Sequence, residues 1–353
     1  MSFRPDSLSA FGAAPFDSVI DVRSPAEFAE DHVPGAVSLP VLDDAERARV
    51  GTIYVRQSAF RARKIGAALV ARNAARHVEG PLADHDGGWR PLVYCWRGGQ
   101  RSNAFAAILG QIGWRVAVLD GGYRTYRGLV KTALYDRAFP ARVVLLDGFT
   151  GTAKTEILHR AARAGAQVID LEGLANHRGS LFGAMGRQPA QKGFESALAE
   201  AMRALDPARP VLVEAESSKV GERVLPPGLW KAMQAAPRIT VEAPLEVRAA
   251  YLARTYDDLC ADPGRLDGIL VSLIRLQGRE RVAHWRDLAR EGRNADLAAE
   301  LMAHHYDPRY ARQLDRGGGG TLGTVTARRL DDTELDALGT RVAEMADMAG
   351  AQG

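Results

Sequence analysis

The chain has 353 residues, of which 46% are hydrophobic and 25% charged, and its formal net charge is +3. This composition is typical of a globular protein, and the length exceeds what one hydrophobic core usually supports, so we expect two domains. No apolar run in the chain approaches the roughly 20 residues of a membrane-spanning helix, and its first residues lack a signal-peptide pattern. These features predict a cytoplasmic protein without membrane contact.

The first part of the chain alternates short apolar segments with helical ones. Strands are predicted at 17–22, at 91–95 and in a segment that ends near Asp120, with helices at 45–76 and 101–113. Such alternation indicates a parallel sheet covered by helices on both faces. We therefore expect a first α/β domain at 1–138, with a helical insertion at about 43–80.

The same pattern restarts near residue 140. Strands are predicted at 141–148, 167–173, 210–216 and 238–244, and from about residue 245 the chain is mostly helical. A second α/β domain with a helical extension is therefore expected at 139–316. The run Gly317–Gly320 predicts a flexible connector, so residues 317–353 are interpreted as a glycine-rich linker and a loosely packed tail.

Only two cysteines are present, Cys95 and Cys260, too few for a cysteine-rich zinc site. Cys95 opens the segment CWRGGQRS between a predicted strand and a predicted helix, whereas Cys260 lies in a polar helical segment and is expected to be inert. Inward-pointing amides at a helix start, together with nearby arginines, lower a thiol pKa. The loop therefore predicts a nucleophilic Cys95 thiolate. Its expected anion-binding loop consists of Trp96, Arg97, Gly98, Gly99, Gln100 and Arg101.

Residues 148–155, GFTGTAKT, follow an apolar strand and open a helix, which is the setting of a Walker A phosphate loop. The expected phosphate-binding residues are Gly148, Gly151, Thr152, Lys154 and Thr155. In such loops backbone amides surround the phosphates, the lysine supplies charge, and the threonine could hold Mg²⁺. Ala153 stands where the usual pattern has its second glycine. The loop therefore predicts phosphate binding more strongly than efficient nucleotide hydrolysis.

Further candidate residues follow two of the predicted strands. Glu214 or Glu216, at the end of the strand 210–216, could hold a water on Mg²⁺. The polar segment after the strand 167–173 is the expected substrate-contacting loop, with Asn176, His177, Arg178 and Ser180 as its candidates. No other metal site is predicted.

A basic stretch from Arg47 to Arg76 contains eight lysines and arginines and no acid. Such a stretch binds a polyanion or forms a solvated helix face, and charge alone does not choose between them. The candidates for nucleic-acid contact are Arg56, Arg61, Arg63, Lys64, Arg72 and Arg76.

The Cys95 loop, together with the segments 21–40 and 113–127, resembles the three ordered signatures of rhodanese-like sulfurtransferases. The whole chain, from about 15 to 312, resembles the tRNA 2-selenouridine synthase family. The residues that carry this resemblance are the Cys95 loop, the phosphate loop, GTIYVRQSAFRARKIGAALVARN at 51–73, DLEGLANHRGSLFG at 170–183 and HHYDPRY at 304–310.

The resemblance implies conversion of the wobble 2-thiouridine of tRNA into 2-selenouridine through S-geranyl-2-thiouridine, with geranyl diphosphate and selenophosphate as co-substrates. Cys95 would carry selenium as a perselenide, Arg97 and Arg101 would hold phosphate, and the phosphate loop would bind a diphosphate. The basic stretch would contact the tRNA in its anticodon region, with Trp96, Tyr54 and Phe60 as candidates for stacking on bases. The phosphate loop could instead bind a nucleotide or a tRNA phosphate.

Two other functions stay open from the residues alone. One is a rhodanese-type sulfurtransferase whose phosphate loop is a regulatory nucleotide-binding site, because the loop chemistry does not distinguish sulfur from selenium. The other is a nucleotide-binding module in which the rhodanese-like domain is only a scaffold. The choice of tRNA and the oligomeric state are not predicted.

Overall fold

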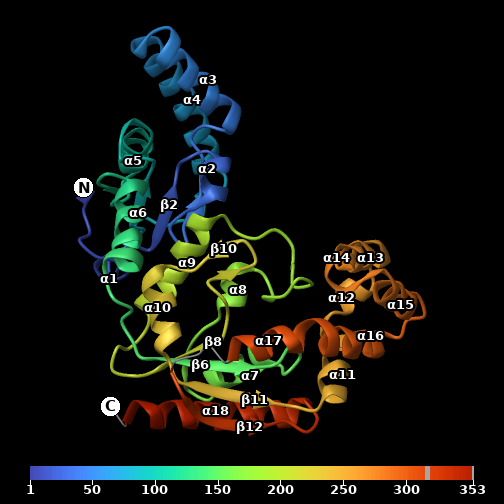
Figure 1. The fold of residues 1–353 in the computed structure, drawn as a ribbon. Coiled ribbons are helices and arrows are strands. Elements are labelled where there is room, and N and C mark those ends of the chain that lie inside the picture. Colours follow the sequence, from blue (N-terminus) through green and yellow to red (C-terminus); the bar gives the residue numbers. More distant parts are fainter. Residues whose placement is uncertain (315–318, 352–353) are drawn as a thin grey trace. The chain divides into compact units, whose positions relative to one another are not determined.

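The computed structural model describes residues 1–314 and 319–351, which divide into two compact units (Figure 1). The first unit comprises residues 1–137 and 189–203, and the second comprises 138–188 and 204–353, with the gaps just given. Both contain a parallel sheet flanked by helices, so the predicted α/β class with two domains is confirmed.

The first unit is built on a five-stranded sheet with the order β1-β5-β4-β2-β3, in which all pairs are parallel. Its elements are β1 (Ser2–Phe3), α1 (Leu8–Gly12), β2 (Ser18–Asp21), α2 (Pro25–Glu30), β3 (Val37–Ser38), α3 (Asp44–Arg56), α4 (Ala59–Glu79), β4 (Pro91–Tyr94), α5 (Gln100–Ile112), β5 (Ala117–Leu119), α6 (Tyr123–Lys131), the π-helical turn η1 (Thr132–Asp136) and α9 (Gln191–Arg203). β4 is buried at every position, as expected for a central parallel strand.

The predicted helical insertion forms a helical hairpin of α3 and α4, joined by Gln57 and Ser58. Ser58 ends the turn as the N-cap of α4, because its side chain accepts a hydrogen bond from the Arg61 amide at 3.3 Å. The two helices lie side by side in Figure 1, as a two-residue connection requires. Ile53 is the buried residue of α3.

The second unit has a five-stranded sheet with the order β12-β11-β6-β8-β7, again all parallel. Its elements are β6 (Val143–Gly148), α7 (Lys154–Arg163), β7 (Gln167–Ile169), α8 (Leu171–Ala175), β8 (Val211–Glu214), β9 (Lys219–Val220), β10 (Arg223–Val224), α10 (Pro227–Ala235), β11 (Arg238–Glu242), α11 (Leu245–Thr255), α12 (Asp257–Cys260), α13 (Pro263–Ser272), α14 (Ile274–Gln277), α15 (Arg279–Arg290), α16 (Asn294–Leu301), the π-helical turn η2 (Met302–Tyr306), α17 (Asp307–Leu314), β12 (Thr321–Thr326) and α18 (Asp332–Ala351). Helices α11 to α17 form the expected helical part, which has an apolar cluster of its own around Trp285 and Leu270.

The prediction of a linker and a loosely packed tail at 317–353 was wrong for most of this segment. β12 pairs in parallel with β11, and α18 packs on α7 with Leu335, Leu338 and Val342 in the main core of this unit. The apolar residues of this segment pack on the sheet, whose strands lie much earlier in the chain. The glycines that precede the segment led to the prediction of a flexible tail. The predicted connector Gly317–Gly320 falls largely outside the described residues, since 315–318 are not described.

The predicted domain boundary at 138–139 also leaves out a later segment of the first unit. The chain leaves the first unit after Arg137, returns to it at Pro189, and leaves again after Arg203. α9 is fixed there because Ser196 donates a hydrogen bond to the buried Asp31 carboxylate at 3.0 Å and Glu195 pairs with Arg127. Among the described helices, none is long and apolar enough to span a membrane.

Candidate active site

Cys95 directly follows β4 and lies just before α5. Its side chain is buried, with 3% exposure, and its sulfur accepts a hydrogen bond from the Gly99 amide at 3.3 Å. The Ser102 hydroxyl lies 3.2 Å from the same sulfur. The first residues of α5 therefore surround the thiol with donors, the arrangement that stabilises an anion at a helix start.

The electrostatics favour the thiolate. Burial of the Cys95 thiol raises its pKa, but the hydrogen bonds from Ser102 and the loop amides, with the charge of Arg101, outweigh burial. The pKa of Cys95 therefore lies below its usual value, as predicted from the sequence.

Glycines let this loop pack closely against the segment after β5. Gly98 has φ +62°, and a Cβ atom there would lie 2.6 Å from the Leu119 carbonyl oxygen. The Tyr123 amide in turn donates to the Cys95 carbonyl oxygen at 2.8 Å. The two glycine-containing segments, 95–102 and 120–127, therefore pack against each other although they are separate in the sequence.

The two arginines of the loop are placed differently. Arg101 forms an ion pair with Glu27 at 2.7 Å, and Arg47 at the start of α3 lies 3.8 Å from the same carboxylate. Arg97 is exposed. Arg97 is therefore the loop arginine free to meet an incoming anion, and Glu27 links the Cys95 loop to the helical hairpin.

The other loop residues complete the rim. Trp96 is half-buried, with its ring centroid 5.2 Å from that of Tyr123, and Gln100 is exposed as the first residue of α5. Below the loop, Asp21 and Arg23 form a buried ion pair at 2.6 Å. Their burial indicates a structural role.

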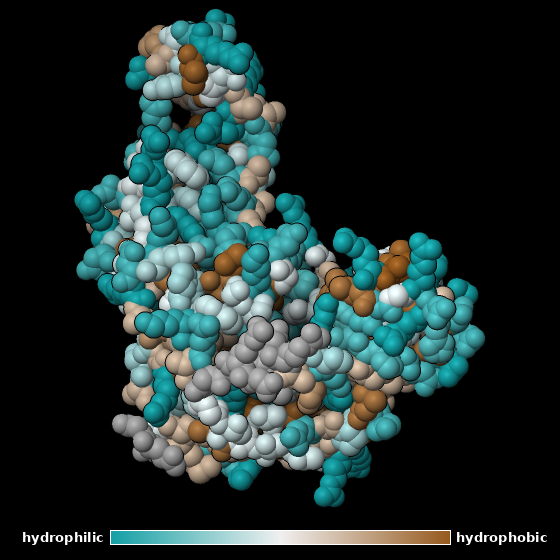
Figure 2. Space-filling view, in the orientation of Figure 1, coloured by the Kyte–Doolittle hydropathy of each residue, from teal (hydrophilic) through white to brown (hydrophobic). Residues whose placement is uncertain are grey.

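The helical hairpin exposes all six predicted contact residues: Arg56, Arg61, Arg63, Lys64, Arg72 and Arg76. Near its turn, Tyr54, Val55 and Phe60 are exposed by 59%, 82% and 71%. We call these three residues the hairpin tip. Figure 2 shows a hydrophobic patch on the hairpin surrounded by hydrophilic side chains. Tyr54 and Phe60 are thus outside the core, as base stacking would require.

The phosphate loop joins β6 to α7. Lys154 donates from Nζ to the Gly148 carbonyl oxygen at 2.7 Å, and Gly151 has φ +85°. A Cβ atom at Gly151 would lie 3.0 Å from the Arg248 carbonyl oxygen, so α11 would crowd any side chain at this position. Ala153 has φ +58° and ψ +31°, a left-handed conformation. Alanine therefore holds the backbone shape that glycine usually adopts at this position, at a cost of about 1–2 kcal/mol.

A cavity of about 670 Å³ opens over this loop. Thr155 donates to Glu172 at 2.8 Å, and Glu172 hydrogen-bonds to Glu216. Burial and the neighbouring charge of Glu172 raise the pKa of Glu216 to about 8. Of the two predicted strand-end acids, Glu216 lines the cavity, whereas Glu214 is buried and accepts a hydrogen bond from the Leu171 amide at 2.9 Å.

The oxygens of Thr155, Glu172 and Glu216 are the type of ligand that Mg²⁺ prefers. The residues at this end of the cavity therefore fit the predicted ion. Within residues 1–314 and 319–351, no cluster of three or more His, Cys, Asp or Glu is arranged to hold a metal.

The predicted substrate loop is divided between two roles. Arg178 and Ser180 line the cavity, and the Arg178 guanidinium lies 4.7 Å from the centroid of the Tyr256 ring. Asn176 instead ends α8 and donates to the Arg187 carbonyl oxygen at 3.1 Å. His177 forms a β-bridge with Ala184 and does not line the cavity. Asn176 and His177 therefore shape the loop and do not contact the cavity.

Two family models match this chain. A rhodanese-like domain matches residues 5–128, and the "tRNA 2-selenouridine synthase AAA domain" matches residues 141–268. The tRNA 2-selenouridine synthase of Cupriavidus necator is 36% identical over 313 residues, which cover 85% of this chain and 81% of that protein. The chain belongs to the tRNA 2-selenouridine synthase family.

Other members of this family show similar agreement. The tRNA 2-selenouridine synthase of Chromohalobacter salexigens is 36% identical, with 84% of this chain and 88% of that protein covered. The enzyme of Hahella chejuensis is 34% identical, with 84% and 86% covered. Because 84% of this chain is covered in each case, both matches include parts of both units.

Several residues that line the cavity over the phosphate loop were not among the predicted site residues. They are Glu172, Tyr256, Tyr306, Arg309 and Tyr310, all of which line the cavity. The segments DLEGLANHRGSLFG and HHYDPRY contain four of them, so the signal was available in the resemblance. Tyr256, on the helical part, had no local motif, and only the fold brings it to the phosphate loop.

Proposed function

We propose that this chain converts 2-thiouridine in tRNA into 2-selenouridine through an S-geranyl intermediate. The observation that carries the proposal is that one chain of this family contains both Cys95, with donors around its sulfur, and a phosphate loop under a large cavity lined by Lys154, Arg178 and Arg309. Two anion sites of different chemistry fit a reaction with two phosphorylated donors.

In the first step, the thione sulfur of the base attacks carbon 1 of geranyl diphosphate. The carbon–oxygen bond breaks with its electron pair on the diphosphate, and the base loses its ring N–H proton. Lys154 and the loop amides would stabilise the leaving diphosphate. Mg²⁺ on Thr155, Glu172 and Glu216 would neutralise further charge when bound.

Alkylation prepares the second step, because a thiolate leaves the ring carbon more readily than unalkylated sulfur. Selenium in selenophosphate is at the oxidation level of selenide, so a perselenide on Cys95 would need an oxidant that the reaction does not supply. We therefore propose that the Cys95 thiolate attacks the phosphorus atom of selenophosphate. The phosphorus–selenium bond breaks, and its electron pair stays on selenium, which leaves as selenide. Selenide held in the loop then displaces geranylthiolate from the ring carbon, and water releases phosphate from the cysteine.

The test supplies thiolated tRNA, geranyl diphosphate and selenophosphate, and identifies the nucleosides by mass spectrometry. Cys95→Ser should accumulate S-geranyl-2-thiouridine without selenouridine, because only the second step uses the thiolate. Lys154→Ala should fail to geranylate, yet should selenate tRNA that already carries the S-geranyl group.

Two results would contradict this division. Loss of geranylation in Cys95→Ser would place Cys95 in both steps. Sulfur transfer from thiosulfate without any need for tRNA would instead favour a rhodanese-type sulfurtransferase with a regulatory phosphate loop.

A further inference from the structure

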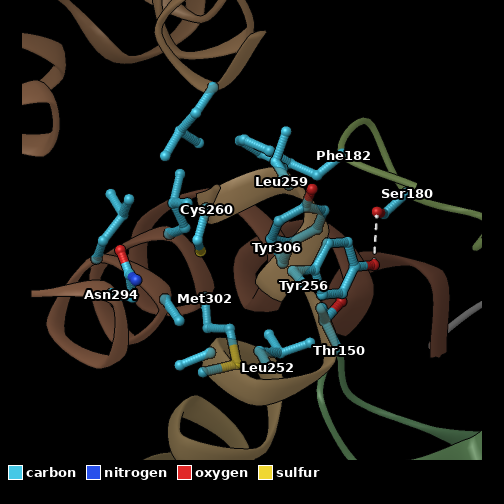
Figure 3. Close-up of a pocket in the computed structure, with 15 residues that line it drawn as sticks. Thr150, Ser180, Phe182, Leu252, Tyr256, Leu259, Cys260, Asn294, Met302 and Tyr306 are labelled. Carbon is cyan, nitrogen blue, oxygen red and sulfur yellow. Dashed lines mark hydrogen bonds between the residues drawn. The ribbon is translucent and has the colours of Figure 1, made fainter. Parts of the chain in front are cut away.

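A second cavity, of about 70 Å³, lies within the helical part of the second unit (Figure 3). Its walls come mainly from α11, α12, α13 and α16, and they are mostly apolar. Leu259, Leu266, Leu301 and Met302 are buried members of this wall. We call it the apolar pocket. Such a pocket favours a hydrocarbon ligand, because few of its atoms could pair with polar groups.

The apolar pocket adjoins the phosphate-loop cavity. Five residues line both spaces: Thr150, Ser180, Leu252, Tyr256 and Tyr306. Thr150 belongs to the phosphate loop itself, and Ser180 and Tyr256 are joined at 3.3 Å between their hydroxyl oxygens. The two spaces therefore share a wall, and a ligand with an anionic head and an apolar chain could occupy both.

The two spaces differ in the chemistry they accept. The phosphate-loop cavity presents Lys154, Arg178 and Arg309, which suit an anion. The part of the apolar pocket away from it is lined by Leu266, Leu297 and Cys260, none of which lines the phosphate-loop cavity. In Figure 3, Cys260 and Asn294 lie on the side opposite Thr150 and Ser180.

We propose that the apolar pocket holds the isoprenoid chain of the alkyl donor while the phosphate loop holds its diphosphate. This inference rests on the proposed function, which names a prenyl diphosphate as the donor. It adds that the chain enters among α11, α13 and α16, with carbon 1 near Thr150. The helical part is therefore the element that distinguishes a prenyl diphosphate from inorganic diphosphate or a nucleotide.

Cys260 gives a direct reading of this pocket. The chain has two cysteines, so Cys95→Ser leaves Cys260 as its one thiol. Burial raises the pKa of Cys260, with Asp257 and Asp258 adding to it, so alkylation by N-ethylmaleimide is best followed above neutral pH. With geranyl diphosphate at about ten times its Kd, alkylation should slow about tenfold, because only the free protein reacts. Inorganic diphosphate and ATP, which leave the pocket empty, should not slow it.

A matched pair of variants on α16 tests the same point in the intact enzyme. Ala298 lines the apolar pocket, whereas Ala295 is exposed on the same helix. Ala298→Phe should fill the pocket and raise the KM for geranyl diphosphate at least tenfold, with inhibition by inorganic diphosphate unchanged. Ala295→Phe should match the wild type.

The outcomes separate this inference from the function on which it rests. Geranylation by the wild type, with unprotected Cys260 and equal behaviour of the two phenylalanine variants, would overturn the pocket assignment and leave the function intact. Protection of Cys260 by both geranyl diphosphate and ATP would likewise overturn the pocket assignment. Absence of geranylation by the wild type would overturn the proposed function itself.

Discussion

Ala153 occupies the position at which the phosphate-loop pattern usually has its second glycine. The backbone at this position is left-handed, a conformation that glycine adopts without strain. Alanine tolerates the same conformation, and its methyl group is buried with 5% exposure. The sequence pattern alone made the substitution a reason for doubt, whereas the backbone shows that the loop geometry is retained.

Ser102 is the residue whose removal should most directly change Cys95. Its hydroxyl lies 3.2 Å from the sulfur and contributes to the lowered pKa of Cys95. In Ser102→Ala the pKa of Cys95 should rise, so the thiolate fraction near neutral pH should fall. The rate of alkylation by iodoacetamide, measured against pH in a Cys260→Ser background, should show its midpoint moved to higher pH.

The matched control for this measurement is Asn103→Ala. Asn103 is exposed on the same helix and donates to loop carbonyl oxygens rather than to the sulfur. Its removal should leave the midpoint unchanged. An unchanged midpoint in Ser102→Ala would mean that the helix amides alone hold the thiolate.

At the scale of elements, the helical hairpin has two kinds of surface that RNA could contact. Its exposed lysines and arginines suit the phosphate backbone, and the hairpin tip offers aromatic rings that no core residue covers. Basic residues along a helix bind the phosphates of any RNA, whereas exposed aromatic rings stack on unpaired bases. We therefore expect the hairpin tip to prefer the anticodon loop over a paired stem.

The corresponding experiment compares an anticodon stem-loop with a paired RNA of equal length by fluorescence anisotropy. Stacking on one base is worth about 1–3 kcal/mol, so Tyr54→Ala and Phe60→Ala should each weaken stem-loop binding by roughly tenfold. Tyr54→Phe should retain binding because it keeps the ring. Equal losses on both RNAs would show that the tip contributes no preference for unpaired bases.

At the scale of the whole molecule, the second unit depends on residues far apart in the chain. β12 forms an edge of its sheet beside β11, and α18 covers α7. Four aliphatic side chains from this region, Leu330, Leu335, Leu338 and Val342, are buried in the main core. At about 1.5–3 kcal/mol each, they supply roughly 6–12 kcal/mol, which is comparable with the whole stability of a domain.

A chain that ends at residue 314 should therefore lose the fold of the second unit. Thermal unfolding should show the loss of one transition, and phosphate-loop activity should disappear. Adding residues 319–353 as a separate peptide should restore part of both. Normal geranylation by the shortened chain would mean that this segment is the dispensable tail suggested by its glycines.

The sequence was most informative where chemistry is local. The Cys95 loop and the phosphate loop are contiguous, so their residues, spacing and flanking elements could be recognised together. The pairing of Glu172 with Glu216 and the apolar pocket depend on segments brought together by the fold, and no local pattern marks them. α9 was missed as part of the first unit because its partners, Asp31 and Arg127, precede it by the length of several elements.

The interleaving of the two units has a consequence for synthesis on the ribosome. The first unit cannot be completed until Arg203 has emerged, by which time β6 and β7 have already been made without β8, the strand that lies between them. The sheet of the second unit then waits for residues 321–326 to cover β11. We expect nascent chains of intermediate length to expose apolar strand edges and to depend on chaperones during translation.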